Sequence, residues 1–227
     1  MKRIFVHIPK TGGNTIQRST QLRDVLVKID TSSFPPAYVK DQAKAMSTFG
    51  LSPQLDHCRW RDLAPEFTRP HGAVAIVRNP WDKVVSQYLF ALKIDREHTH
   101  HPKNTAAIRA GTTFEEFIAG RHRWGLEPYF WHRTTVGWYP QLAHVTDDAG
   151  YVRCDILRFE HHAAETMAYF GLDRPLAKRN VTDPDRADYR TFYTPRTQRE
   201  IGEWFVRDVD YFGFTFDTGA TRGTWAT

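Results

Sequence analysis

The segment His7-Ile8-Pro9-Lys10-Thr11-Gly12-Gly13-Asn14-Thr15 decides the fold, and we call it the glycine loop. It overlaps a short apolar run, Ile4 to Ile8, which predicts a buried strand. Its two glycines predict a tight turn, and Asn14 or Thr15 is a suitable N-cap for a helix that runs to about Arg23. The segment therefore predicts a strand, a loop and a helix in immediate succession.

A loop of this kind is suited to bind an anion. The first N–H groups of a helix have no partner within the helix, and the helix dipole places positive charge there. Gly12 and Gly13 let the backbone approach an anion closely, and Lys10 adds a point charge. Three further side chains can donate hydrogen bonds to anionic oxygens, namely Thr11, Asn14 and Thr15. From these residues alone, a structural glycine turn with an exposed lysine stays open as the alternative.

The order of residues in the loop differs from that of a Walker A loop. The Walker motif, GxxxxGK[ST], places its lysine after the second glycine and its hydroxyl on Mg²⁺. Here Lys10 precedes both glycines. A P-loop kinase or NTPase also needs an acidic metal ligand at a strand end, whereas the clearest buried strand, Ala73 to Val77, runs into Arg78.

A second motif follows that strand: Arg78-Asn79-Pro80-Trp81-Asp82-Lys83-Val84-Val85-Ser86-Gln87-Tyr88. Asn79 is a suitable cap for a helix, and Pro80 suits its first position. Ligands of open α/β sheets bind outside the carboxyl ends of the strands, so Arg78 is well placed to bind a phosphate. Ser86 lies two helical turns further on and can reach the same phosphate. The alternative for Arg78 is a capping or salt-bridged role.

Strands and helices alternate along the rest of the chain. We expect further strands at Asp24 to Ile29 and Tyr151 to Phe159, and helices at Ala37 to Phe49, from Thr113 with a capping-box pattern, at His161 to Phe170 and at Pro195 to Arg207. This alternation predicts an α/β class, with a P-loop-like three-layer fold and a central mainly parallel sheet flanked by helices. Residues 1–227 contain no repeat or linker and are expected to form a single domain.

Composition narrows the functional classes. The formal net charge of +5 favours anionic ligands, but no basic run indicates nucleic-acid binding. Cys58, Cys154 and the histidines lack zinc-like spacing, so no metal is expected. The N-terminal apolar run is too short for a signal peptide or a membrane span. We therefore expect a cytoplasmic protein in a reducing compartment.

The two motifs, in this order, resemble those of the PAPS-dependent sulfotransferases (PAPS is 3′-phosphoadenosine 5′-phosphosulfate). The resemblance is greatest to the Golgi heparan sulfate and other carbohydrate O-sulfotransferases and their bacterial relatives. It spans most of the chain and includes three weaker features, Ile156-Leu157-Arg158-Phe159-Glu160, Asn180-Val181-Thr182 and Asp210-Tyr211-Phe212-Gly213-Phe214. It implies that Lys10 to Thr15 bind the 5′-phosphosulfate, and that Arg78 and Ser86 bind the 3′-phosphate.

The resemblance also implies the reaction, in which the sulfuryl group moves from PAPS to an acceptor hydroxyl, on a carbohydrate, and PAP is released without help from a metal. In-line transfer needs stabilisation of the leaving oxygen, a task for Lys10. The acceptor hydroxyl needs a general base, and histidine has a suitable pKa near neutral pH.

His57 is the predicted base, because it lies between the two motifs, where many relatives carry a Gly-His pair whose histidine acts as base. Asp56 replaces the small residue of that pair. Glu160 is the alternative base, since some sulfotransferases use a carboxylate, although an ion pair with Arg158 is the structural explanation for it. A nucleotide- or glycan-binding module without turnover is the non-catalytic alternative.

Overall fold

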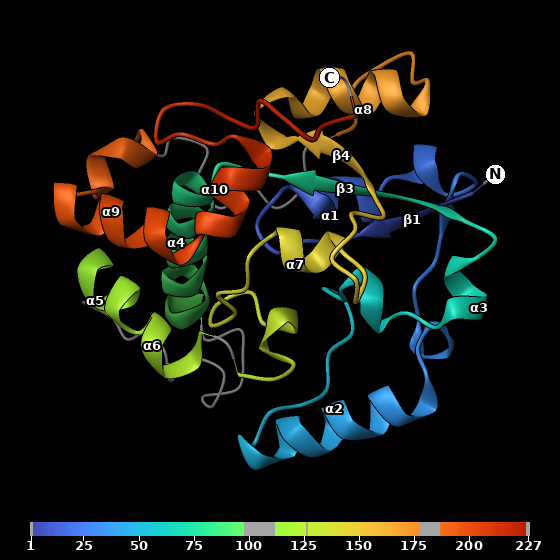
Figure 1. The fold of residues 1–227 in the computed structure, drawn as a ribbon, viewed down its shortest axis with the longest axis horizontal. Helices are drawn as coiled ribbons and strands as arrows, with labels where there is room; N and C mark the ends of the chain where they lie inside the picture. The colour runs from blue at the N-terminus through green and yellow to red at the C-terminus, as the bar shows by residue number, and fades with distance from the viewer. Residues whose placement is uncertain (1, 98–111, 126, 178–186, 226–227) are drawn as a thin grey trace.

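The computed structural model describes residues 2–97, 112–125, 127–177 and 187–225. Within these residues the centre of the fold is a parallel sheet with the strand order β2-β1-β3-β4. The strands are β1 Arg3–Val6, β2 Leu26–Val27, β3 Gly72–Val77 and β4 Asp155–Arg158. The predicted α/β class, with a central parallel sheet flanked by helices, is confirmed (Figure 1).

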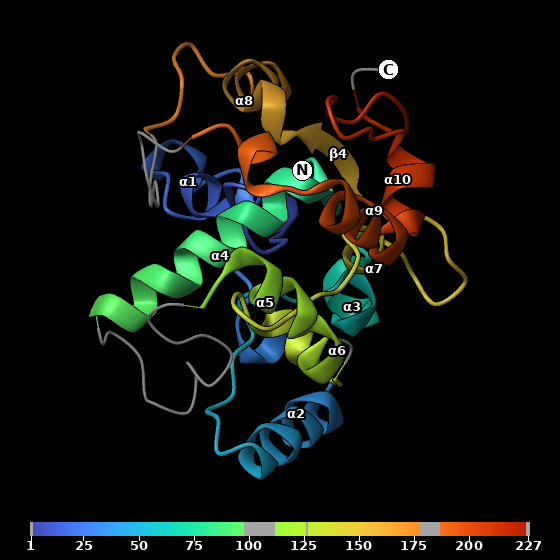
Figure 2. The same cartoon turned by 90° about the vertical axis from the view of Figure 1, so that its left-hand side faces the viewer.

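The α-helices are, in chain order, α1 Gly13–Gln17, α2 Pro36–Thr48, α3 Pro65–Thr68, α4 Pro80–Glu97, α5 Phe114–Ala119, α6 Arg121–Trp124, α7 Leu142–Val145, α8 His162–Phe170, α9 Pro195–Trp204 and α10 Val206–Phe212. Figures 1 and 2 show α8 at one end of the molecule and α2 at the other. Helices α4, α5 and α9 pack against one another, and α6 follows α5.

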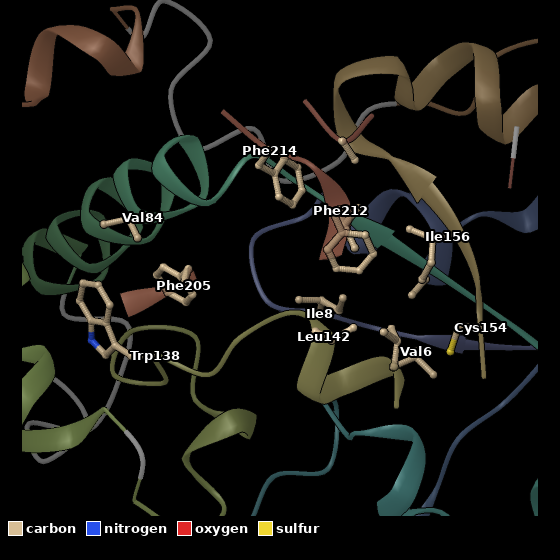
Figure 3. Close-up of a cluster of buried hydrophobic side chains, with 14 of the residues drawn as sticks. Val6, Ile8, Val84, Trp138, Leu142, Cys154, Ile156, Phe205, Phe212 and Phe214 are labelled. Carbon is tan, nitrogen blue, oxygen red and sulfur yellow. The ribbon is translucent and has the colours of Figure 1, made fainter. Parts of the chain in front are cut away.

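The sheet separates two apolar clusters, because successive side chains of a strand point to opposite faces. One face presents Val6, Ala75 and Ile156, which are in register, to a cluster that includes side chains of α4, α7 and α10 (Figure 3). The other face presents Phe5 and Val74 to a cluster that includes side chains of α1 and α8. Helices therefore cover both faces, which gives the predicted three layers.

Helix α4 begins as the sequence predicts. Asn79 Oδ1 accepts a hydrogen bond from the backbone N–H of Trp81 (3.0 Å), and Pro80 is the first helical residue. Asn79 Nδ2 also donates to the backbone oxygens of Thr215 and Thr218 (both 2.9 Å). One buried side chain thus caps α4 and fixes the C-terminal tail to the carboxyl end of β3.

Two other helix ends also follow local rules. Thr113 and Glu116 form the predicted capping box, in which the Glu116 N–H donates to Thr113 Oγ1 (3.2 Å) and the Thr113 N–H donates to Glu116 Oε2 (2.7 Å). Helix α8 ends at Gly171, whose φ of 64° lies in the left-handed region that favours glycine. The capping box is confirmed, and Gly171 directly follows the helix predicted at His161 to Phe170.

The first helix differs from its prediction. Gly12, with φ of 82°, is its N-cap in place of Asn14 or Thr15, and the helix ends at Gln17 instead of Arg23. A separate turn of 3-10 helix, Thr20–Leu22, follows. Ser19 is the N-cap of this turn, and its hydroxyl accepts a hydrogen bond from the backbone N–H of Gln21. Serine favours such capping positions over the interior of a helix.

The C-terminal helix also differs, because the stretch from Pro195 to Arg207 is broken into α9 and α10 at Phe205. Phe205 is fully buried, with φ of −102° and ψ of 26°. The break lets Trp204 donate its indole N–H to the Trp138 carbonyl (2.9 Å) while Phe205 enters the core. Strand β2 is likewise shorter than its prediction, because only Leu26–Val27 pair with β1.

Replacing Asn79 by alanine is expected to destabilise the protein by about 2–3 kcal/mol, because the change removes a helix cap and two further hydrogen bonds. The measurement is urea denaturation monitored by circular dichroism. Thr113→Ala, which removes a cap at an exposed helix start, serves as the control and should cost about 1 kcal/mol. Equal losses in the two variants would contradict the second role of Asn79 in holding the tail.

Candidate active site

The glycine loop leaves the carboxyl end of β1 and enters α1. Lys10 has φ of 65°, a left-handed conformation that costs a non-glycine residue about 1 kcal/mol or more. Its ammonium lies 4.0 Å from the centre of the Phe90 ring on α4. Strain of this kind is commonly found at functional sites, and here it directs a cation away from the sheet edge towards α4.

The two glycines are required by packing within the site. A Cβ on Gly13 would lie 2.1 Å from Cδ2 of His7, and a Cβ on Gly12 would lie 3.1 Å from Cε2 of Phe159. The sequence-based explanation was close approach to an anion. The structure adds a second reason, because the loop folds back tightly on its own histidine and on the end of β4.

The hydroxyl-bearing residues of the loop are not equivalent. The fully buried Thr11 donates its hydroxyl proton to the Ile8 carbonyl (2.9 Å), so its side chain stabilises the loop. In this conformation the hydroxyl proton of Thr11 is used within the loop, and its hydrogen bond to an anion stays a prediction. Asn14, partly exposed, and Thr15, buried, lie in the first turn of α1 instead of at its N-cap.

Arg78 brings the second motif to the glycine loop. One guanidinium nitrogen, NH1, donates to the Lys10 carbonyl (2.9 Å), and Nε donates to Asp82 Oδ2 (2.6 Å). The guanidinium also lies 4.0 Å from the centre of the Phe159 ring, and only 6% of the residue is exposed. Arg78 therefore forms the salt bridge that the sequence offered as an alternative. The same guanidinium also binds the backbone of the glycine loop.

Gln141 fixes the backbone at this point. Its side chain accepts from the Arg78 N–H (2.9 Å) and donates to the Arg78 carbonyl (2.7 Å). The backbone N–H of Gln141 donates in turn to Asp208 Oδ2 on α10 (2.7 Å). A fully buried amide therefore holds the carboxyl end of β3 in place.

Ser86 and Glu160 lie at the edges of this arrangement. Ser86 is buried on α4, two turns beyond its start, as predicted. Glu160 accepts from the Asn79 N–H (2.7 Å), and desolvation raises the pKa of its carboxyl. The suggested ion pair of Glu160 with Arg158 is wrong, because Arg158 is paired with Glu165.

His57 lies against the glycine loop. Its Nδ1 is 2.9 Å from the His7 carbonyl oxygen, and its Nε2 is 3.3 Å from Thr134 Oγ1. Desolvation lowers the pKa of His57, and the positive charge of Lys10 lowers it further, against the bond to His7 and the charge of Asp56. A neutral imidazole at pH 7 is the form that a general base needs.

Three more imidazoles are buried near His57. His7, His132 and His144 each have a pKa well below the usual value, chiefly because burial desolvates the charged form, and His57 adds to the effect in all three. His7 Nδ1 lies 2.9 Å from Gln17 Oε1, and its ring lies edge-on to that of His57 at 4.3 Å. These rings surround the candidate base with neutral, protonatable groups.

A cavity of about 700 Å³ lies between α1 and the carboxyl end of β2. Its lining includes Gln17, which contacts His7, and Asp56, which precedes His57. Arg18 and Lys28 add positive charge to the same wall. Asp56 therefore brings the cavity lining to the residue next to the candidate base in the chain, and Gln17 is connected to that base only through His7.

Several other kinds of site receive no support from the described residues. In these ranges no group of three His, Cys, Asp or Glu side chains is arranged to hold a metal ion. No helix of the described part of the chain combines the length and hydrophobicity needed to cross a membrane. Cys58 and Cys154 are buried free thiols. The predicted Asn180-Val181-Thr182 feature lies outside the described residues.

Sequence reasoning missed three residues that shape the site. Asp82 was detectable, since it stands four positions after Arg78, the spacing of an ion pair next to a helix start. Gln141 and Thr134 carry no local signal, because their partners are 63 and 77 positions away.

No protein-family model and no curated protein matches the chain. The solved structures that are similar to it at low identity include two sulfotransferases. A sulfotransferase from Alicyclobacillus acidocaldarius has 17% identity and a TM-score of 0.46, over 92% of this chain and 93% of the other. Mouse sulfotransferase SULT7A1 complexed with PAP has 14% identity and a TM-score of 0.47, over 92% and 83%.

The buried imidazoles predict a protein that is sensitive to acid. The pKa values of His7, His132 and His144 in the folded protein lie below about 6.5, so the unfolded chain binds protons first as the pH falls. Above about pH 6.5 these histidines make their full contribution to the free energy of unfolding. Below that pH each group lowers the free energy of unfolding by up to about 1.4 kcal/mol per pH unit. The raised pKa values of Asp208 and Glu160 act in the opposite direction, while the lowered pKa of His57 adds to the effect of the three other histidines.

Urea denaturation between pH 8 and pH 5 measures this effect. We expect the free energy of unfolding to fall slightly from pH 8 to pH 7, because buried Lys83 has a pKa of about 8 in the folded protein, and to fall steeply below about pH 6.5. His122→Asn, which removes an exposed imidazole, should leave the profile unchanged. An equal free energy of unfolding at pH 7.5 and pH 5.5 would show that these rings are not buried in the neutral form.

Proposed function

We propose that the chain is a sulfotransferase that moves the sulfuryl group of PAPS onto an acceptor hydroxyl. One observation carries the proposal: two carbonyls of the glycine loop bind His57 and Arg78, so a base, an arginine and the Lys10 ammonium belong to one assembly. A sulfuryl transfer needs these three groups: a general base, a cation and a loop that binds the anionic donor. They lie at the carboxyl ends of β1 and β3, where α/β sheets bind their ligands.

Lys10 and the N–H groups of the glycine loop are the groups that we assign to the phosphosulfate of PAPS. Helix α1 has only five residues, so its dipole is small and more of the task falls to Lys10. A flexible lysine can turn from the Phe90 ring to an anionic oxygen. When bound, PAPS supplies the sulfuryl group. Arg78 and Ser86 are assigned to its 3′-phosphate.

His57 is assigned as the general base. A carbonyl only accepts hydrogen bonds, so the contact with His7 requires that Nδ1 carry the proton and leaves the lone pair on Nε2. Nε2 takes the proton of the acceptor hydroxyl, and the His7 carbonyl stabilises the charged ring that forms. Lys10 stabilises the negative charge that develops on the leaving oxygen.

The acceptor is proposed to be a carbohydrate hydroxyl that enters through the cavity between α1 and β2. A volume of about 700 Å³ is typical of sites for small ligands. Gln17 and Asp56 provide polar groups on the side of the cavity next to His57. Polar and cationic side chains are suited to the hydroxyls and acidic groups of a glycan.

A P-loop kinase or NTPase is the rival function. It would need a carboxylate to hold Mg²⁺ beyond a strand end. The first carboxylate after β3 is Asp82, which is buried in its ion pair with Arg78. Within the described residues this arrangement favours a donor whose transfer needs no metal.

Isothermal titration calorimetry with PAP, 5′-AMP and ATP with Mg²⁺ separates these functions. We expect PAP to bind more tightly than 5′-AMP, because only PAP engages both phosphate sites. Lys10→Met should weaken PAP binding about tenfold or more, the effect of losing a charged hydrogen bond. Lys2→Met, at the opposite end of β1, is the matched control and should bind normally. Tight binding of ATP with Mg²⁺ and none of PAP would contradict the proposal.

His57→Asn tests the base. The variant should bind PAP within about twofold of the wild-type protein and lose about 10²–10⁴-fold in ³⁵S transfer from PAPS to an acceptor found by screening glycans, lipids and small hydroxylated molecules. Because desolvation lowers the pKa of His57, the wild-type transfer rate should be level above about pH 6.5 and fall below that pKa. Full transfer by the variant would move the role to Glu160, and a screen without any acceptor would favour a binding module.

A further inference from the structure

Both ring nitrogens of His57 have protein contacts. The contact of Nδ1 with the His7 carbonyl fixes the proton on Nδ1 and the lone pair on Nε2. The second contact, 3.3 Å from Nε2, is the hydroxyl of Thr134. Since a lone pair only accepts, the hydroxyl is the donor in this pair.

Thr134 is brought to His57 by a part of the chain that lies in neither motif. It stands in the segment after Phe130–His132, and 77 positions separate it from His57. Gln87 of α4 holds this segment, because its Nε2 donates to the carbonyls of Thr135 (3.1 Å) and Gly137 (3.3 Å).

The turn around Thr134 is closed. The Gly137 N–H donates to the Arg133 carbonyl (2.9 Å), and a Cβ on Gly137 would lie 2.2 Å from the Phe130 carbonyl oxygen. The buried Arg133 guanidinium also contacts Met46 Sδ (3.1 Å) and the Ser52 carbonyl. These contacts hold the backbone that carries Thr134 in place beside His57.

An imidazole has one lone pair, so Thr134 and a substrate hydroxyl compete for it. We propose that Thr134 covers the lone pair of His57 until the acceptor displaces it, and that this protects bound PAPS from hydrolysis. The proposal rests on the proposed function. In hydrolysis, a water oxygen bonds to sulfur, Nε2 takes a water proton, and the bond from sulfur to the phosphate oxygen breaks to give sulfate and PAP.

The difference between water and acceptor is one of binding energy. An acceptor held by the rest of its structure can displace the Thr134 hydroxyl, whereas a water molecule has no such additional contacts. The other groups that act on His57 are the rings of His7, His132 and His144 and the charges of Lys10 and Asp56. A change at Thr134 leaves all of these side chains in place.

Thr134→Val tests the proposal, because it keeps the shape of the side chain and removes the donor. NMR of the His57 ring nitrogens at pH 8 should show a changed resonance of the unprotonated Nε2, because this atom loses its hydrogen-bond donor. Release of PAP from PAPS without acceptor should rise about threefold or more, the effect of losing one neutral hydrogen bond. Thr134→Ser keeps the donor and should restore both values, and Thr135→Val is the matched control for loss of a neighbouring hydroxyl.

Each result bears on the proposal. An unchanged Nε2 resonance in Thr134→Val overturns the contact, and a changed resonance with PAP release equal to that of the wild-type protein, zero included, overturns the protective role. Thermal denaturation of each variant confirms folding, and Thr134→Ala provides a second variant if valine is not tolerated. Absence of PAP binding to the wild-type protein would instead contradict the proposed function, while the NMR measurement at pH 8 would still report on the contact.

Discussion

Two backbone carbonyls of the glycine loop, those of His7 and Lys10, hold the rest of the site together. The first accepts from the ring of His57 and the second from the guanidinium of Arg78, each at 2.9 Å. The backbone supplies both acceptors, so these bonds depend on the path of the loop more than on its side chains. That path depends on Gly13, which leaves room for the His7 ring, and on the left-handed conformation at Lys10.

Support for the loop comes from the opposite side of the core. Asp208 accepts the backbone N–H groups of Gln141 and Leu142, and the Gln141 side chain binds both backbone groups of Arg78. Lys83, buried in the same region, has its pKa lowered to about 8 by desolvation despite the charge of Asp208. Burial of the opposite charges of Lys83 and Asp208 contributes little to net stability. We interpret these buried charges as a means of fixing the position of the backbone at Gln141 and Leu142. A continuous set of polar contacts thus joins α10 to the glycine loop.

Local rules in the sequence were enough for the elements that carry their own signals. The alternation of strands and helices gave the α/β class, and Asn79 with Pro80 gave the start of α4, because a cap and its helix are adjacent in the chain. The break at Phe205 was not predictable, since it depends on the core that receives the ring. His57 was chosen as the candidate base from resemblance, whereas its place next to the loop, its tautomer and the contact with Thr134 depend on pairings across the fold.

Position 10 combines a left-handed backbone with a positive charge, and no single residue type is well suited to both. Glycine or asparagine would relieve the backbone strain, and only a long cationic side chain would provide the charge. In evolutionary terms, random change at this position leads readily to variants that fold more easily and have lost their cation. Retention of lysine in descendants of this chain would then record selection for binding an anion, and its replacement by glycine would mark a lineage in which only the scaffold is still in use.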